Sequence, residues 1–380
     1  GAGGAQAQSL WDVADKATDE HLKAHGAGIR CVATADDSVF TGSSQPVVRV
    51  WQVAEAKVTE ARTMKHGAVG SSCVEVDQEE RMVAICSDDG SIGLWDTRES
   101  KRLFELPATI PTAWKAKFLP GGRRLVSGGP SGTLCFWDLG LRSLVREVGA
   151  GGGPPSAAKA DGRDPAKRRR VDEAKGDAAA DEAKAGTAGP GEQRSQSPVY
   201  SLAVSTDGRY LACGRGSGAV SVLRLPSEGR SEWLGDVSAH WDASVSPVRA
   251  LAFDPGCRLV LSGGDDSHVC LLDAAAWGRN RRPGDVARAP QLERFSAHRG
   301  WVTSVSACPD KGRHIALSTS WDSTVKLWDY RTHTPLRLYK EHSDSVSGGA
   351  FAPRNGRFFV TVGADAQLVL YTASTSALVA

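Results

Sequence analysis

Four residue types that can do chemistry recur together along the chain: a His, a Ser or Thr, an Asp and a Trp. The fullest copy holds His298, Ser318, Asp322 and Trp328. His, Ser and Asp are also the members of a nucleophilic triad, in which the imidazole takes the proton of the Ser hydroxyl. A protein builds a catalytic triad once, whereas this set returns several times in altered form. The repetition therefore favours a structural role over a catalytic one.

Weaker copies of the set occur at three other places. They comprise His66, Asp89 and Trp95; His240, Ser262 and Asp266; and His342, Thr361 and Asp365. In each copy we expect the Asp to accept hydrogen bonds from the imidazole and from backbone N–H groups, and the chain of bonds to end on an indole where a Trp is present. A satisfied hydrogen bond contributes about 1 kcal/mol, and an orphaned buried partner costs ~1 to 3 kcal/mol. The pattern thus predicts buried networks that tie neighbouring turns together.

Other motifs give no support to an enzyme. The sequence contains no G-x-x-x-x-G-K-[ST] loop, no GxSxG elbow, no H-E-x-x-H pair and no EF-hand loop. The eight cysteines form no C-x-x-C pair and no cluster with His, so they predict no zinc site. We therefore expect no enzymatic activity, no cofactor, no metal and no small-molecule substrate.

The elements that must position these residues are short apolar runs arranged in a repeating unit. Seven units end at Trp51, Trp95, Trp137, Leu223, Leu272, Trp328 and Tyr371. Trp51 and Trp95 are 44 residues apart, and Trp95 and Trp137 are 42 apart. A period of ~40 to 45 residues with alternating runs is typical of the four-stranded blades of a propeller. The sequence therefore predicts an all-β, seven-bladed β-propeller.

The two ends of the chain are expected to share one blade. A spare stretch resembling a fourth strand lies near the start, at about Thr18 to Ala24, and the chain ends soon after the third strand of unit seven. We expect a flexible N-terminus over residues 1–15. Blades one to three with the ring-closing strand should occupy residues 16–148, and blades four to seven residues 197–380.

Two segments interrupt the repeat. Residues 149–196 contain Val171 as the only residue among Val, Ile, Leu, Met, Cys and the aromatics. Such a segment cannot bury enough apolar surface to offset its ordering entropy, so we expect it to be disordered. Residues 274–290 carry four arginines and lengthen unit five. We expect them to form a flexible loop.

The charge of the chain is nearly balanced. Its formal net charge is +2, which gives no global field toward nucleic acid or anionic lipid. No apolar run is long enough to cross a membrane. Basic residues cluster at Lys167, Arg168, Arg169 and Arg170, a run that resembles a short nuclear import signal. This run and the arginines near 280 lack the interleaved aromatics of a single-strand binder, so a nucleic-acid-binding propeller stays an alternative only.

The units resemble those of the WD-repeat family. Their order is most similar to the small WD-repeat subunit shared by the superkiller RNA-decay complex and the polymerase-associated factor transcription-elongation complex. The segments PTAWKAKFLPGGRRLVSG, HRGWVTSV and EHSDSVSGGAF carry this resemblance. It implies a non-enzymatic scaffold in the nucleus and cytoplasm. Its implied partners are a helical-repeat scaffold and an RNA helicase, or elongation-factor subunits, with no direct nucleic acid and no membrane.

A partner-binding surface is predicted where the first strand of each blade begins. Aligning the units places Arg30, Ser72, Trp114, Tyr200, Arg249, Thr303 and Ser347 at the mouth of the central channel. Trp301 and Trp321 lie in neighbouring loops of unit six. Exposed Trp, Tyr and Arg supply most of the energy at protein interfaces. We therefore expect a partner to contact Arg30, Trp114, Tyr200, Arg249, Trp301 and Trp321, although Trp114 and Trp301 could also simply cover the ends of the core.

A rival binding role rests on two W-D-x-R boxes, which end at Arg98 and Arg331. Such boxes occur in substrate receptors of cullin-type ubiquitin ligases, where the Arg would pair with an acidic adaptor surface. An Arg after Trp-Asp is also typical of a solvated turn, and we favour that interpretation. The receptor function remains an alternative.

Overall fold

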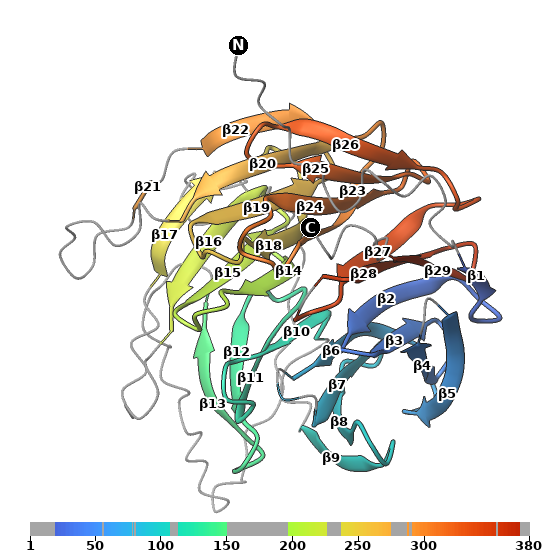
Figure 1. Cartoon of the computed structure of the whole chain (residues 1–380). Helices are drawn as coiled ribbons and strands as arrows, with labels where there is room; N and C mark the ends of the chain where they lie inside the picture. Colours follow the sequence, from blue (N-terminus) through green and yellow to red (C-terminus); the bar gives the residue numbers. More distant parts are fainter. Residues whose placement is uncertain are drawn as a thin grey trace, which may run out of the picture.

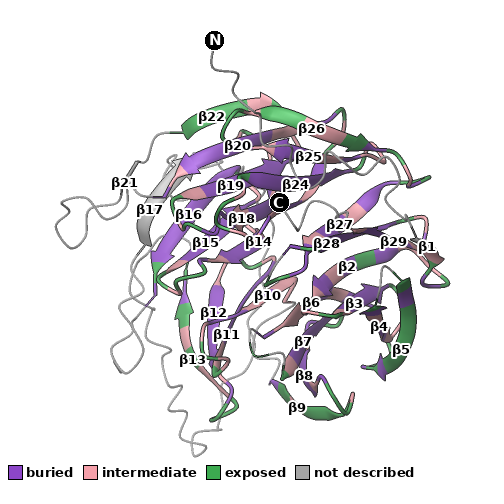
Figure 2. Cartoon of the chain, viewed as in Figure 1, coloured by how far each residue is buried: buried purple, intermediate pink, exposed green. Residues whose placement is uncertain are grey.

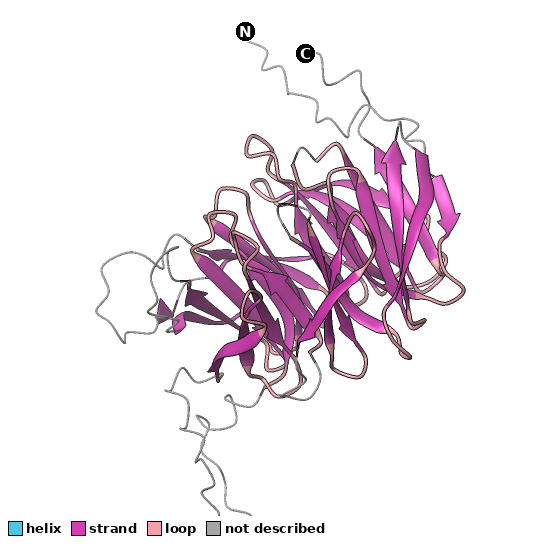
Figure 3. Cartoon of the chain, turned by 90° about the horizontal axis from the view of Figure 1, so that it is seen from below, coloured by secondary structure: helices cyan, strands magenta, loops and turns pink. Residues whose placement is uncertain are grey.

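Short β-strands, nearly all of them paired antiparallel, make up the regular structure that is described. The computed structural model describes residues 20–54, 57–77, 79, 81–106, 113–149, 197–225, 237–274, 287–288, 291–354 and 356–372. For residues 20–21, 237–242 and 287–288 it gives the backbone only. Figure 3 shows strands and loops across this part of the chain and no helix.

Seven sheets stand around a central axis, and each is one blade (Figure 1). Blade 1 holds β2 (Ile29–Thr34), β3 (Ser38–Ser43), β4 (Val47–Ala54) and β5 (Lys57–Lys65). Blade 2 holds β6 (Ser71–Val76), β7 (Met82–Ser87), β8 (Ile92–Asp96) and β9 (Arg102–Leu106). Blade 3 holds β10 (Lys115–Phe118), β11 (Arg124–Gly128), β12 (Leu134–Asp138) and β13 (Ser143–Val148).

The second half of the ring repeats this plan with two variations. Blade 4 holds β14 (Val199–Val204), β15 (Tyr210–Arg215), β16 (Ala219–Arg224), β17 (Val237–Asp242) and β21 (Ala287–Arg288). Blade 5 holds β18 (Val248–Phe253), β19 (Leu259–Gly264), β20 (His268–Asp273) and β22 (Gln291–Ser296). Blade 6 holds β23 (Val302–Ala307), β24 (Ile315–Ser320), β25 (Val325–Asp329) and β26 (Thr334–Tyr339). Blade 7 holds β27 (Val346–Phe351), β28 (Phe358–Gly363), β29 (Gln367–Thr372) and β1 (Glu20–Lys23). The predicted seven-bladed propeller is confirmed.

Burial changes from the middle of each blade to its rim. The second strand of blade 6, β24, is buried along its whole length, because both of its faces pack against neighbouring blades. The outermost strand β22 is largely exposed and β26 is partly exposed, and Figure 2 shows green on both at the rim. The hydrophobic core is therefore a ring of layers between adjacent blades, which fixes the strand ends at its two faces.

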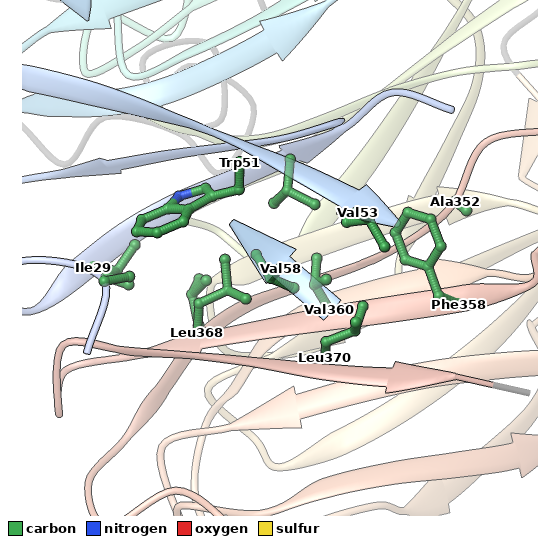
Figure 4. Close-up of a cluster of buried hydrophobic side chains, with 12 residues drawn as sticks. Ile29, Trp51, Val53, Val58, Ala352, Phe358, Val360, Leu368 and Leu370 are labelled. Atoms are coloured by element: carbon green, nitrogen blue, oxygen red, sulfur yellow. The ribbon is translucent and has the colours of Figure 1, made fainter. Parts of the chain in front are cut away.

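The ring closes where the two ends of the chain meet in blade 7. Strand β1 pairs antiparallel with β29, with Glu20 opposite Leu370 and Lys23 opposite Gln367. Apolar side chains of blades 7 and 1, including Trp51 and Phe358, pack together beside this junction (Figure 4). The predicted sharing of one blade by the two ends is confirmed.

The segment that interrupts unit five joins two blades. Its residues Ala287 and Arg288 form β21, which pairs in parallel with β17 of blade 4, and Ala274 at its start is buried. We expected residues 274–290 to be a flexible loop, but this short strand takes up backbone groups on the outer edge of β17 that would otherwise stay unpaired. The rest of the segment, residues 275–286 and 289–290, lies outside the described residues.

The other two expectations about flexible segments concern residues that the structure does not describe. These residues are 1–15 and 150–196; of the predicted segment 149–196, only Gly149 is described. The basic run Lys167–Arg170 lies in the same range.

Candidate partner-binding surface and the buried networks

Five side chains from blades 3 to 6 form a continuous row on one face of the ring. The rings of Trp114 and Tyr200 lie with centroids 5.4 Å apart. The guanidinium carbon of Arg249 is 5.1 Å from the centroid of Tyr200 and 4.8 Å from that of Trp301. Trp301 stacks on Trp321 at 4.4 Å. We call this row of Trp114, Tyr200, Arg249, Trp301 and Trp321 the aromatic–arginine array.

A repeated irregularity of the backbone positions two members of the array. In six blades the pairing of the innermost strand shifts register at its second residue, and in blades 4 and 5 those residues are Tyr200 and Arg249. The same shift occurs at Arg30, Ser72, Thr303 and Ser347. A β-bulge leaves one residue unpaired and re-aims its side chain. Trp114 directly precedes β10, so it lies at the corresponding corner of blade 3.

Arg249 is held in place from three sides. Its Nη2 donates to Oδ2 of Asp265 at 2.9 Å, and its Nε donates to Oδ1 of the same carboxylate. The rings of Tyr200 and Trp301 flank the guanidinium at cation–π distances. A cation fixed by a bidentate partner and two rings loses little entropy on binding, so this residue is preorganised at the centre of the array.

The sixth predicted contact residue lies apart from the array. Arg30 donates from Nη1 to Oδ2 of Asp88 at 2.6 Å, in blades 1 and 2. Both Arg30 and Arg249 line the central channel, a cavity of about 220 Å³. Deeper in this channel Lys117 donates from Nζ to both carboxylate oxygens of Glu75, at 2.6 and 2.8 Å. The channel mouth therefore carries paired charges.

The network predicted from His298, Ser318, Asp322 and Trp328 is complete in blade 6. His298 Nε2 lies 2.7 Å from Oγ of Ser318, and its Nδ1 lies 3.3 Å from Oδ2 of Asp322. Trp328 Nε1 donates to the same Ser318 hydroxyl at 2.8 Å. Although these contacts resemble a catalytic triad, Ser318 is 1% exposed. No substrate carbonyl can reach such a hydroxyl.

The electrostatics of this network also oppose a catalytic role. Burial lowers the pKa of His298 to about 4, in spite of the neighbouring Asp322 carboxylate. An imidazole with so low a pKa is a weak general base near neutral pH. Hydrogen bonds to Asp322 from Thr324 and from the backbone N–H of Arg299 offset its burial and lower the pKa of its carboxyl.

Blade 7 keeps most of the same arrangement. His342 Nε2 lies 2.8 Å from Oγ1 of Thr361, and its Nδ1 lies 2.9 Å from Oδ2 of Asp365. The position of the Trp is taken by Tyr371, whose hydroxyl donates to Glu341 at 3.3 Å. The structure therefore brings His342, Thr361 and Asp365 together as predicted from the sequence pattern.

In blade 2 the expected chain of bonds does not form. His66 Nδ1 contacts Oγ of Ser87 at 3.2 Å, while Asp89 accepts from the N–H and hydroxyl of Ser91. Within the described residues, the buried atoms Nε2 of His66 and Nε1 of Trp95 have no hydrogen-bond partner. The cause is Ile85, which is fully buried ten residues before Trp95, where blade 6 has Ser318 ten residues before Trp328.

In blade 5 the sequence pattern selected the wrong residue. His240 lies in β17, in register with Ser221 of the preceding blade, and not in the turn before β18. That turn holds Ser244, whose hydroxyl donates to Oδ2 of Asp266 at 2.7 Å. Arg294 donates to the same oxygen at 3.0 Å. Ser262 is buried as expected, ten residues before Leu272.

Blade 1 contains a network that the sequence pattern did not indicate. His25 Nε2 lies 2.9 Å from Oγ1 of Thr41, and Trp51 Nε1 donates to that oxygen at 2.8 Å. The other ring nitrogen of His25 lies 3.2 Å from Oγ of Ser43. The sequence did contain a signal for this network: the hydroxyl residue lies ten residues before the Trp that donates to it. The same spacing holds for Ser127 and Trp137, which are hydrogen-bonded in blade 3.

Comparison with known families identifies the repeat. The sequence profile of the family described as "WD domain, G-beta repeat" matches residues 59–96, 191–222, 233–273 and 290–329. These segments fall in blades 1 and 2 and in blades 4 to 6. The chain is therefore a β-propeller that contains WD repeats. The network of His298, Ser318 and Trp328 lies within one of these matched repeats.

Several proteins of known function are similar to this chain. A ribosome biogenesis protein WDR12 homolog from Chlamydomonas reinhardtii is 27% identical over 389 residues, which cover 95% of this chain and 68% of that protein. Protein HIR1 from Chaetomium globosum is 29% identical, but the match covers 46% of this chain and 17% of that protein. A DDB1- and CUL4-associated factor 11 homolog from Caenorhabditis briggsae is 32% identical over 36% of this chain and 22% of that protein.

The two W-D-x-R boxes of these WD repeats lie on the opposite face from the array. In both, the Asp caps a turn: Asp96 accepts from the N–H of Arg98 at 2.7 Å, and Asp329 accepts from that of Arg331 at 2.8 Å. These turns follow the third strand of their blades, whereas the array lies where the first strands begin. Arg98 and Arg331 are exposed.

Two further searches of the described residues gave negative results. No three or more His, Cys, Asp and Glu side chains are grouped so that they could hold a metal ion there. Within the same ranges, no helix has the length and apolar character needed to span a membrane.

Proposed function

We propose that this WD-repeat propeller is a non-enzymatic protein-interaction subunit that captures a segment of its partner on the aromatic–arginine array. WD-repeat propellers generally bind proteins. The observation that carries the proposal is the continuity of the array, in which five hot-spot side chains contact one another across four blades. Trp301 and Trp321 are 38% and 54% exposed, which leaves ring surface available to a partner.

The paired charges at the channel mouth favour a protein over a nucleic acid as the partner there. Single-strand binders combine stacking aromatics with a groove of unpaired positive charge. Here the two arginines at the channel mouth, Arg30 and Arg249, are paired with Asp88 and Asp265. Their positive charge is therefore already compensated.

The experiment that tests the surface compares two double variants of the full chain. Replacing Trp114 and Arg249 with Ala should weaken capture of the partner by at least ~2 kcal/mol, about thirtyfold, while the fold is kept. The matched control replaces the exposed Arg98 and Arg331 on the opposite face. A Trp114→Ala/Arg249→Ala protein that captures its complex at wild-type levels would place the binding site elsewhere.

The type of complex is part of the proposal. The similarity of nearly the whole chain to a ribosome biogenesis protein supports a nuclear ribosome-biogenesis assembly. The sequence resemblance suggested two other complexes: an RNA-decay complex with a helical-repeat protein and a helicase, or a transcription-elongation complex. We rank both below the ribosome-biogenesis assembly, because none of the relatives described above is named for RNA decay or transcription elongation. Affinity purification of the full chain followed by mass spectrometry distinguishes them. Enrichment of ribosome-assembly factors supports the first assignment, and enrichment of helicase or elongation-factor subunits contradicts it.

Nuclear entry would follow from the basic run Lys167–Arg170, which lies outside the described residues. A short cluster of Lys and Arg is the type of segment that import receptors bind. Changing Lys167, Arg168, Arg169 and Arg170 to Gln should reduce the nuclear share of a fluorescently tagged chain. An unchanged distribution would contradict the import signal.

A second function, as substrate receptor of a cullin-type ligase, is favoured by one observation. The relative named DDB1- and CUL4-associated factor 11 homolog matches part of this chain, and Arg98 and Arg331 are exposed in boxes of the corresponding kind. If this function holds, the full chain should co-purify with a cullin adaptor. That capture should be lost in Arg98→Ala/Arg331→Ala and kept in Trp114→Ala/Arg249→Ala.

A further inference from the structure

A second cavity lies on blade 6, beside the end of the array. It has a volume of about 450 Å³. Seven of its eight lining residues have polar or charged side chains; the eight are Arg299, Asp322, Ser323, Thr324, Lys326, Leu338, Lys340 and His342. We call this cavity the basic pocket.

The basic pocket and the array share two loops. Arg299 is two residues from Trp301, and Asp322 directly follows Trp321. The two loops are joined by a hydrogen bond from the backbone N–H of Trp321 to the carbonyl of Trp301, at 2.9 Å. An extended chain advances about 3.3 to 3.6 Å per residue, so one short segment can lie on the stacked indoles and continue into the pocket.

Positive charge in the pocket exceeds what its own carboxylate neutralises. Arg299, Lys326 and Lys340 line it, and across the described ranges none of the three makes an ion pair with an Asp or Glu. Lys326 donates from Nζ to the carbonyl of Ala297 at 2.5 Å, which orients the ammonium without neutralising it. Arg299 and Lys340 are exposed.

The single carboxylate of the pocket, Asp322, is occupied by other donors. Its Oδ1 accepts from the N–H and hydroxyl of Thr324, and its Oδ2 accepts from the N–H of Arg299 and lies 3.3 Å from His298. His298 adds no positive charge near neutral pH, because burial lowers its pKa to about 4. The three cations are therefore available to an anion from outside the chain.

We propose that the basic pocket binds a carboxylate side chain of the same partner segment whose apolar or aromatic residue lies on the Trp301–Trp321 stack. The inference rests on the proposed function and specifies the chemistry of the partner: an acidic peptide segment with a large apolar residue next to its Asp or Glu. The exposed side chain of Leu338, at 46%, offers an apolar wall to the methylenes of that residue. The fixed negative charge of Asp322 favours a singly charged carboxylate over a doubly charged phosphate.

The test selects twelve-residue random peptides displayed on phage against the purified full chain. Wild-type protein should enrich peptides in which Asp or Glu follows or precedes a Trp, Phe, Tyr, Leu or Met within a few residues. The variant Arg299→Glu/Lys340→Glu should lose the acidic preference while it retains the apolar one, and a synthetic enriched peptide should bind it at least tenfold more weakly. The control Lys311→Glu/Arg123→Glu makes the same charge change at exposed turns of the opposite face and should select the wild-type sequences.

The outcomes separate this inference from the proposed function. Peptides that share an apolar residue but no acid, and that require Trp321, would overturn the basic pocket as a carboxylate site and leave the array as a binding surface. Selection of no common sequence, or of sequences unaffected by Trp321→Ala, would overturn both. Binding of fluorescein-labelled dT12 that is lost in Arg299→Glu/Lys340→Glu, without selection of acidic peptides, would reassign the pocket to nucleic acid.

Discussion

Trp301 and Trp321 stack with their ring centroids 4.4 Å apart and their planes inclined by 26°, although more than a third of each side chain is exposed to solvent. Exposed aromatic pairs contribute little to the core, because most of their surface is not removed from water. Both rings are fixed by loops of blade 6 that the part-buried His298–Asp322 contact ties together. The pair is therefore a rigid surface. Burying it against a partner contributes free energy to binding, whereas it contributes little to folding.

The first prediction concerns Trp321. Replacing Trp321 with Ala should lower the free energy of unfolding by less than ~1 kcal/mol, because the ring is 54% exposed, and should weaken partner capture at least tenfold. Urea denaturation and quantitative pull-down measure the two effects. As a contrast, Trp328→Ala removes a buried indole and should cost ~3 to 5 kcal/mol. Similar losses of stability in both variants would show that Trp321 belongs to the core.

A second prediction compares two aspartates of blades 6 and 2. Asp322→Ala leaves the N–H groups of Arg299 and Thr324 without their acceptor and leaves His298 Nδ1 with only the Thr324 hydroxyl, so it should destabilise the fold by ~2 to 4 kcal/mol. Asp96→Ala removes only the cap of a solvated turn and should cost under ~1 kcal/mol. Chemical denaturation of the two proteins checks the difference, and equal losses would refute the assignment of Asp322 to a buried network.

The third prediction uses the orphaned atoms of blade 2. Ile85→Thr supplies a hydroxyl ten residues before Trp95, at the position from which Thr41 and Ser318 accept the indole N–H in blades 1 and 6. We expect Ile85→Thr to be about 1 kcal/mol more favourable for the free energy of unfolding when the indole N–H of Trp95 is present than when it is absent. A double-mutant cycle with Trp95→Phe measures it by thermal and urea unfolding. Ile92→Thr, at another buried position of the blade, is the control and should show no coupling to Trp95.

Stability should also depend on pH through the buried imidazoles. Burial lowers the pKa of His25 and of His298 to about 4, from an ordinary value of 6.5. Between these values the unfolded chain binds more protons than the folded one, so the stabilisation is complete above pH 6.5 and is lost as the pH falls toward 4. We expect each imidazole to account for a loss on the order of 1 to 2 kcal/mol between pH 7 and pH 5. Unfolding curves of His298→Gln should show a flatter pH profile than wild type, and an identical profile would contradict the mechanism.

The long interruption between blades 3 and 4 gives the fifth prediction. The residues on both sides of the interruption are anchored in the propeller without its help, because Val148 and Val199 are both buried in one hydrophobic cluster. Replacing residues 149–196 with a short Gly/Ser loop should therefore leave the melting temperature nearly unchanged, since loop length affects closure entropy only logarithmically. Differential scanning calorimetry is the measurement. A fall of ten degrees would show that the replaced residues pack against the propeller.

The regular part of the fold could be predicted from two features of the repeat. Apolar and polar residues alternate along each strand, and the residue that ends each unit, often an aromatic one, recurs at a regular spacing. The second strands are buried on both faces, so they need continuous small or apolar residues, as in β24. Even the closing strand was predictable, because one unit lacked a fourth strand and the start of the chain had one to spare. Strand β1 at Glu20–Lys23 lies within the stretch expected for it.

The networks were harder to predict, because turn geometry and not sequence distance decides which side chains meet. His240 precedes Asp266 at a suitable distance along the chain, yet the hydrogen bond comes from Ser244. His25 gave no signal because Gln45, four residues after Thr41, stands where blade 6 has Asp322 four residues after Ser318. In the array, strand alignment indicated Trp114, Tyr200 and Arg249. The pairing of Arg249 with Asp265 depends on a register shift that no residue pattern reveals.

The pairing of β1 with β29 has a consequence for how the chain folds during its synthesis. Glu20 lies 350 residues before its partner Leu370, so blade 7 stays incomplete until β29 has left the ribosome. During translation β1 has no neighbour, and its free N–H and C=O groups can pair with any other exposed strand. Contacts between residues so distant in sequence also form late and slowly. A chain that stops short of β29 would therefore carry two open edges, and such edges promote association between unfinished copies.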